Sequence, residues 1–260
     1  MSSPTLIWQM QDGVVEITMN RPDHANALNA QMADELFEAA CRCEAEGARA
    51  IILTGAGRMF NAGGDLAEFN TTPNRAAHVT RMAAMLHAAL ARFAHQNAPV
   101  ITAVNGAAGG GGFSLALAGD IILASERAKF VSAYTASGLT PDGSSTYFLA
   151  KYVGLLRAKE LMLTNRVLSA QEACDWGMVT RVVAPEALME EARAMAMQFA
   201  QGPTQAYGGV KRLLDSAYTA SLEAQMDLET RAIAGAMRTH DGPHGIASFL
   251  AKQKPVFKGV

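Results

Sequence analysis

The stretch Ile101–Asp120, ITAVNGAAGGGGFSLALAGD, carries the strongest fold signal in this chain. It opens apolar and β-prone, breaks at Asn105-Gly106, passes through four consecutive glycines and then resumes an apolar helical pattern. This order predicts a strand, a tight turn and the start of a helix. The first peptide N–H groups of a helix lack partners, so an anion or a developing oxyanion fits there. A glycine turn that serves only close packing explains the same residues equally well.

The composition around this stretch is that of a globular protein. Half of the 260 residues are hydrophobic, 18% are charged, and the formal net charge is −2. This balance gives no electrostatic case for nucleic acid or a membrane as the main partner. We also expect no signal peptide and no membrane span. The three cysteines, at 41, 43 and 174, lack the spacing of disulfides or zinc ligands, so we expect reduced thiols in a cytoplasmic protein.

Hydrophobic periodicity divides the chain near residue 200. Apolar runs typical of strands occur at Leu6–Met10, Val14–Met19, Ala50–Leu53, Ile121–Ala124, Phe130–Tyr134 and Arg181–Val183. Helical spacing covers Asn29–Glu46, Arg75–His95, Glu186–Gln201, Ala206–Tyr218, Leu222–Met237 and His244–Lys252. We therefore expect a mixed β/α core over residues 1–200 and an all-helical region over residues 201–260.

A second glycine turn follows the strand predicted at Ala50–Leu53. Residues 60–66 are FNAGGDL, and alone they are compatible with an ordinary loop. The recurrence of strand, glycine turn and helix gives this segment more weight. With Asn20–Leu28 (NRPDHANAL) and Val104–Asp120, in this order and spacing, it resembles the crotonase superfamily of enoyl-CoA hydratases and isomerases.

The resemblance covers essentially the whole chain and implies its architecture. An α/β fold is expected, in which ββα units form a crotonase-like spiral and a helical C-terminal region packs around the active site and between subunits. Members of the superfamily are usually homotrimers or dimers of trimers. They act on acyl-CoA thioesters, so coenzyme A would arrive as part of the substrate, with no metal or redox cofactor.

The resemblance also assigns site residues. The peptide N–H groups of Gly64 and Gly111 would hold the thioester oxygen, an arrangement that stabilises an enolate. The adenine of coenzyme A would lie near the loop around Ala25 and the backbone of residues 62 and 63. The complete set implied to bind coenzyme A is Ala25, Ala62, Gly63, Gly64, Asp65 and Leu66.

The two glutamates with which hydratases of the superfamily activate water are absent here. Their positions hold Ser114 and Tyr134, which cannot replace a pair of carboxylates at neutral pH. Ordinary hydratase activity is therefore not expected. Asp142 occupies the position of the acid/base in some isomerases of the superfamily. From its local sequence alone, an aspartate before a helix is more often an N-cap.

Residues 128–183 most resemble ring-opening isomerases of the phenylacetate pathway and related enoyl-CoA isomerases, with further similarity to 4-chlorobenzoyl-CoA dehalogenase. In that dehalogenase, an aspartate matching Asp142 attacks the ring and a histidine matching His87 activates water. Tyr134 and Pro141 depart from its pattern. The hypothesis is an acyl-CoA isomerase in which Asp142 moves a proton. The alternatives are dehalogenase-type substitution, hydratase-like activity and a non-catalytic binder of acyl-CoA or RNA; His87 is also compatible with a half-buried helix residue.

Overall fold

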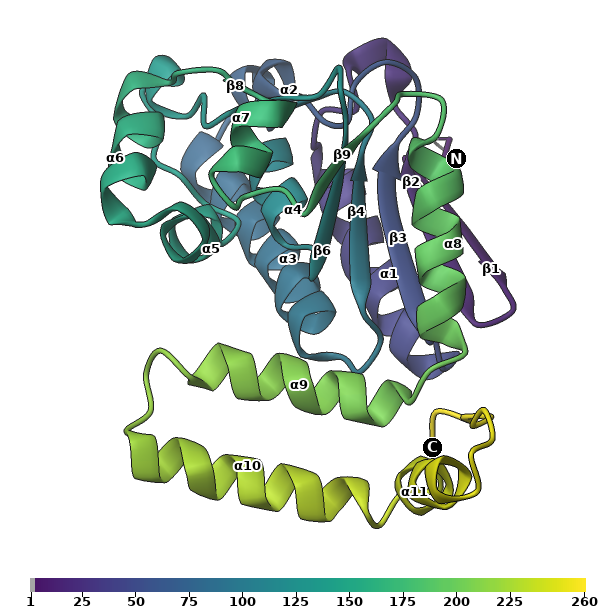
Figure 1. Cartoon of the computed structure of the whole chain (residues 1–260). Helices are drawn as coiled ribbons and strands as arrows, with labels where there is room; N and C mark the ends of the chain where they lie inside the picture. Colours follow the sequence, from purple (N-terminus) through teal and green to yellow (C-terminus); the bar gives the residue numbers. More distant parts are fainter. Residues whose placement is uncertain (1–2) are drawn as a thin grey trace.

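The computed structural model describes residues 3–260 and has the predicted α/β architecture (Figure 1). The main sheet has six strands in the order β1-β2-β3-β4-β6-β9, in which only the β1–β2 pair is antiparallel. The hairpin turns at Asp12-Gly13. The strands are β1 (Leu6–Gln11), β2 (Val14–Met19), β3 (Ala50–Gly55), β4 (Val100–Val104), β6 (Ile121–Ser125) and β9 (Arg181–Val183).

A second sheet has three strands, which belong to the repeated unit of the fold. It contains β5 (Ala107–Gly109), β7 (Lys129–Val131) and β8 (Leu168–Ser169). β4 continues into β5 and β6 into β7, so a long strand, a short strand and a helix recur along the chain. The strand predicted at Phe130–Tyr134 is shorter, because Ala133 adopts a positive φ of 58° and turns the backbone out of the sheet.

Helices cover both faces of the main sheet (Figure 1). α1 (Ala30–Ala45) and α3 (Arg75–His95) lie on one face, and α8 (Leu188–Ala200) on the other. The side chain of Asn29 accepts the N–H of Met32, which starts α1 where the apolar period begins. Small residues of α8, among them Ala192 and Ala196, pack against the strands.

Five shorter helices connect the strands: α2 (Leu66–Thr71), α4 (Gly111–Leu117), α5 (Ser145–Val153), α6 (Leu155–Thr164) and α7 (Ala170–Asp175). α2 and α6 were not predicted from the sequence. α2 begins at Asp65, whose side chain accepts the N–H of Glu68 at 3.2 Å. α6 follows directly on Gly154, whose φ of 79° lets the chain change direction. α4 is buried along its whole length and brings the glycine-rich turn into the core.

The C-terminal helices α9 (Thr204–Ser216), α10 (Leu222–Ala236) and α11 (Asp241–Leu250) form a separate layer (Figure 1). Lys211 of α9 reaches the core, where its Nζ lies 2.8 Å from Asp120 Oδ2. Within residues 3–260, α10 buries none of its side chains. The predicted boundary near residue 200 falls in the turn between α8 and α9, and the division into two domains stays a prediction. None of the described helices is long and apolar enough to cross a bilayer.

Candidate active site

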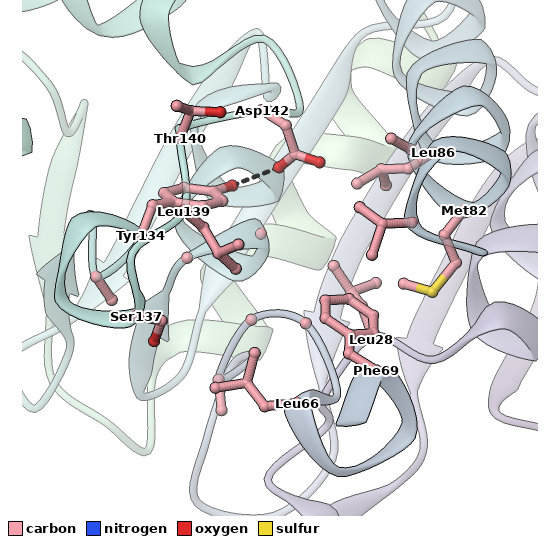
Figure 2. Close-up of a pocket in the computed structure, with 18 of the residues that line it drawn as sticks. Leu28, Leu66, Phe69, Met82, Leu86, Tyr134, Ser137, Leu139, Thr140 and Asp142 are labelled. Atoms are coloured by element: carbon pink, nitrogen blue, oxygen red, sulfur yellow. Dashed lines mark hydrogen bonds between the residues drawn. The ribbon is translucent and has the colours of Figure 1, made fainter. Parts of the chain in front are cut away.

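A cavity of about 280 Å³ lies between α3 and the two glycine turns (Figure 2). Gly64, Gly111 and Asp142, which the sequence analysis assigned to different parts of one site, all line it. The rest of the wall is mostly apolar and is formed by Leu28, Ala33, Leu66, Phe69, Val79, Met82, Ala83, Leu86 and Leu139. The structure therefore places one carboxylate and two glycine turns around an apolar chamber.

Two unpaired peptide N–H groups meet at this cavity. The short bridge between Leu28 and Gly64 uses the carbonyl of residue 63 and the N–H of residue 65, each in a 2.7 Å hydrogen bond. It leaves the N–H of Gly64 without an acceptor in the described part of the chain. Gly111 is the first residue of α4, so its N–H has no intrahelical partner. A Cβ built on Gly111 would lie 3.9 Å from the Gly64 nitrogen, so the two amides are close neighbours.

Close backbone approach explains the glycines of the second turn. Gly110 has φ 50° and ψ −124°, outside the regions that other residues favour. A Cβ on Gly112 would lie 2.2 Å from the carbonyl oxygen of Asn61, closer than any two such atoms can be. Asn61 is fully buried and accepts the N–H of Gly63 through its side chain at 2.8 Å. The two glycine turns therefore pack directly on each other.

Asp142 is held by a small hydrogen-bond network. The hydroxyl of Tyr134 donates to Asp142 Oδ1 at 2.7 Å (Figure 2). Ser114 Oγ lies 2.8 Å from both the Tyr134 hydroxyl oxygen and the carbonyl oxygen of Asp142. Ser114 and Tyr134 stand at the two positions where hydratases of the superfamily carry glutamates. In this structure both of them form hydrogen bonds with Asp142.

Burial and charge keep Tyr134 a hydrogen-bond donor. Burial, with the adjacent carboxylate of Asp142, raises the pKa of Tyr134 far above its ordinary value. The phenol consequently stays protonated and continues to donate to Oδ1. The other oxygen, Oδ2, makes no hydrogen bond to any residue between 3 and 260. Oδ2 is therefore the oxygen that can exchange a proton with a bound substrate.

His87 lies behind Asp142 rather than in the wall of the cavity. Its Nε2 accepts the N–H of Gly143 at 3.0 Å and lies 3.9 Å from Asp142 Oδ2. An imidazole nitrogen that accepts a hydrogen bond carries no proton, so this contact assigns the proton to Nδ1 of a neutral ring. The side chain is half exposed. The structure brings His87 to Asp142 and leaves its predicted catalytic role a prediction.

The segments predicted to bind coenzyme A meet at one edge of the cavity. The N–H of Ala62 donates to the carbonyl of Ala25 at 3.0 Å, which joins the two loops. Leu66 is 51% exposed at the rim. The carboxylate of Asp65 is already engaged, because it pairs with Arg21 at 2.9 Å and caps α2. Hydrogen bonding and the Arg21 charge lower its pKa despite the opposing effect of burial, the largest single influence. Contact with coenzyme A stays a prediction for these residues.

Part of the cavity wall was not predicted from the sequence. Met82 and Leu86 of α3 line the cavity, although neither was singled out as a site residue. The only available signal was the stripe of apolar residues on α3, and periodicity cannot distinguish a stripe that faces a cavity from one that faces a core. Within residues 3–260, no three His, Cys, Asp or Glu side chains gather in an arrangement that could hold a metal ion.

Comparison with known proteins agrees with this geometry. Residues 9–260 match the family model described as enoyl-CoA hydratase/isomerase. The 1,2-epoxyphenylacetyl-CoA isomerase of Escherichia coli K12 is 39% identical over 98% of both chains. The 4-chlorobenzoyl coenzyme A dehalogenase-2 of an Arthrobacter species is 35% identical over 93% of this chain and 89% of its own. An enoyl-CoA hydratase crystal structure from Bacillus anthracis superposes with a TM-score of 0.92 at 32% identity, covering 98% of this chain and 100% of the other. The chain therefore belongs to the enoyl-CoA hydratase/isomerase family.

Proposed function

We propose that this enzyme is an acyl-CoA isomerase, which shifts a double bond or rearranges a ring-derived acyl group through a thioester enolate. One observation carries the proposal: Asp142 is the carboxylate that lines an apolar cavity bounded by two unpaired peptide N–H groups. The absence of glutamates at positions 114 and 134 supports it. The name of the Escherichia coli relative, an isomerase of an acyl-CoA, is consistent with the same class of reaction.

The proposed reaction needs one movable proton. The thioester oxygen accepts hydrogen bonds from the N–H groups of Gly64 and Gly111, which stabilise the negative charge of the enolate. Loss of one such donor typically costs about 3 kcal/mol in the transition state. Oδ2 of Asp142 removes a proton from the carbon next to the thioester and returns it to a carbon further along the chain. Coenzyme A enters with the substrate, and the proposal requires no metal or redox cofactor.

The test is Asp142→Asn, assayed with a panel of unsaturated and aromatic acyl-CoA esters. Asparagine preserves the shape and the hydrogen bond from Tyr134 but cannot accept a proton. We expect turnover to fall by about 10²–10⁴-fold while acyl-CoA binding is nearly unchanged. Asp12→Asn is the matched control, because Asp12 lies in the β1–β2 turn at a φ of 51° that asparagine tolerates. Equal turnover in Asp142→Asn and wild type would exclude the assigned role.

A second candidate function is dehalogenase-type substitution on an aromatic acyl-CoA. The position of His87 Nε2, 3.9 Å from Asp142 Oδ2, favours it, since a histidine there could activate water. This function requires an aryl ester on Asp142, which mass spectrometry of the quenched enzyme detects. We favour the isomerase because Tyr134 and Pro141 depart from the pattern of the dehalogenase.

We further propose that the chain forms a homotrimer or a dimer of trimers in the cytoplasm. Large apolar side chains of the C-terminal region support self-association, since Leu214, Tyr218 and Phe249 are 65%, 74% and 82% exposed. Three free cysteines, at 41, 43 and 174, are consistent with a reducing compartment.

A further inference from the structure

We infer that His87 connects the acid/base Asp142 with solvent in a second cavity, so that the proton moved by the enzyme exchanges with water. The inference rests on the proposed isomerase function, because it concerns the proton that Asp142 carries between two carbons of the substrate. In this role His87 exchanges protons with Asp142 and does not contact the substrate.

The second cavity continues the first along α3. It has a volume of about 220 Å³, large enough for several water molecules. The first cavity is lined on α3 by residues 79, 82, 83 and 86, and the second by residues 87, 90, 91 and 94. These positions follow helical spacing and form one continuous face. His87 is the first of them to line the second cavity, and it stands directly behind Asp142.

The second cavity also holds polar groups that can bind water. They are His87 and His95 of α3, Ser144 just before α5, Tyr147 of α5 and Asp215 of α9. The side chain of Asp215 makes no hydrogen bond to another residue in the range 3–260, so its carboxylate is free to accept one. These hydroxyl, imidazole and carboxylate groups can form hydrogen bonds with a chain of water molecules along the wall of the second cavity.

The other side of Asp142 is closed to proton exchange. Oδ1 is bonded to Tyr134, which is 9% exposed, and Tyr134 contacts Ser114, which is fully buried. Neither residue lines the second cavity. The side chain of Asp142 is itself 35% exposed, and an acyl group in the first cavity would cover the part that faces that cavity. His87 is then the described titratable side chain that both reaches Asp142 and is half exposed.

The geometry around Oδ2 fits a transfer to His87. Figure 2 shows the oxygen of Asp142 that is not bonded to Tyr134 turned toward Leu86, the residue next to His87 on α3. After Asp142 takes a proton from the substrate, the imidazole releases the N–H of Gly143 and turns the 3.9 Å from Nε2 to Oδ2 into a hydrogen bond. Oδ2 then passes the proton to Nε2, and the ring releases the proton of Nδ1 to water. The reverse sequence returns a solvent proton to Oδ2. No charge or atom is gained or lost, and the only coreactant is water.

Isomerisation of 3-hexenoyl-CoA in deuterated water tests the inference. Turnover without exchange carries the original hydrogen from C2 to C4, whereas exchange through His87 leaves deuterium at C4, which mass spectrometry counts. We expect deuterium in the wild-type product and at least about tenfold less in that of His87→Gln. Glutamine can still accept the N–H of Gly143 through its amide oxygen, but it cannot relay a proton. Deuterium is counted per molecule of product, so a change in the turnover number of this variant does not imitate the loss of the relay.

The matched control is His95→Gln, a histidine of the same cavity two helical turns away, which should incorporate as much deuterium as the wild type. Equal incorporation in His87→Gln and wild type overturns the relay while leaving the isomerase intact. A wild-type product without deuterium overturns it as well. Failure of the wild type to isomerise any member of the acyl-CoA panel overturns the proposed function and, with it, the relay.

Discussion

Tyr134 leaves Asp142 one oxygen with which to react. Its hydroxyl binds Oδ1, and its raised pKa keeps the hydrogen bond in place at any physiological pH. A carboxylate held in this way presents Oδ2 to the substrate in a fixed orientation, and preorganisation of that kind is a main source of enzymatic rate enhancement. In the proposed reaction, Tyr134 is therefore a positioning residue for Asp142.

Tyr134→Phe should lower kcat by about tenfold, because a hydrogen bond to a charged group contributes about 1.5–3 kcal/mol. KM should change little, since the ring and the apolar wall remain. Steady-state kinetics of the isomerase reaction measure both constants. Tyr147→Phe is the control, as Tyr147 is 46% exposed and lies outside the first cavity. A variant that loses affinity instead of rate would contradict the positioning role.

The buried phenol of Tyr134 should make the stability of the folded protein depend on pH. The folded state keeps the Tyr134 proton that the unfolded state loses above about pH 10. The free energy of unfolding should therefore fall as pH rises through that value, and it should fall less steeply in Tyr134→Phe. Urea denaturation at about pH 8 and about pH 11 measures the difference. Identical pH dependence in the two proteins would argue against the buried, neutral phenol.

At the level of elements, the position of α4 against the first glycine turn determines the distance between the two free amides. Gly112→Ala places a methyl group against the carbonyl of Asn61, so α4 must shift. We expect a loss of stability of about 1–3 kcal/mol, together with a loss of activity. Gly209→Ala in α9 is the control, because nothing lies within 4 Å of its added Cβ, and it should stabilise the chain by about 0.5–1 kcal/mol. Thermal denaturation of both variants checks the contrast.

α9 is attached to the core by an ion pair whose lysine is buried. Lys211 is 8% exposed and donates to the carbonyls of Phe93 and Ala98, besides pairing with Asp120, which is 30% exposed. Lys211→Met should cost about 1–3 kcal/mol, because the carboxylate keeps only the N–H of Val100 as a partner. Adding Asp120→Asn should recover part of that loss, since the uncompensated charge is gone. Denaturant unfolding of the two single variants and the double variant gives the coupling, and additive losses would show that the two groups do not interact.

Much of this arrangement follows from sequence patterns, and the remainder depends on contacts between distant segments. Periodicity predicted α1, α3 and most strands, because each buries an apolar face or a whole apolar run. α2 escaped prediction, since six residues without a buried side chain carry no apolar stripe. The two glycine turns were recognisable because they recur. The hydrogen bonds that join Ser114, Tyr134 and Asp142 could not be predicted, because no local sequence pattern shows which loops come together in the folded chain.

At the scale of the whole molecule, α10 presents an apolar stripe that the chain itself does not cover. Leu222, Met226, Ile233 and Met237 fall within one narrow sector of the helix and are 46–70% exposed. We expect the chain to elute with the mass of a trimer or a dimer of trimers in size-exclusion chromatography with light scattering. Leu222→Glu with Ile233→Glu should dissociate it, whereas Ala224→Glu on another face of α10 should not. A monomeric wild type would contradict the proposed assembly.

The tight fit between Gly143 and Ser114 limits how this catalyst could acquire a different chemistry. A Cβ on Gly143 would lie 2.7 Å from that of Ser114, whose hydroxyl also touches Tyr134. A glutamate at position 114 therefore has no room while the 142–143 loop keeps its present course. If the proposed function holds, an evolutionary path from this site to one that adds water must therefore remodel the loop before it can introduce the glutamate.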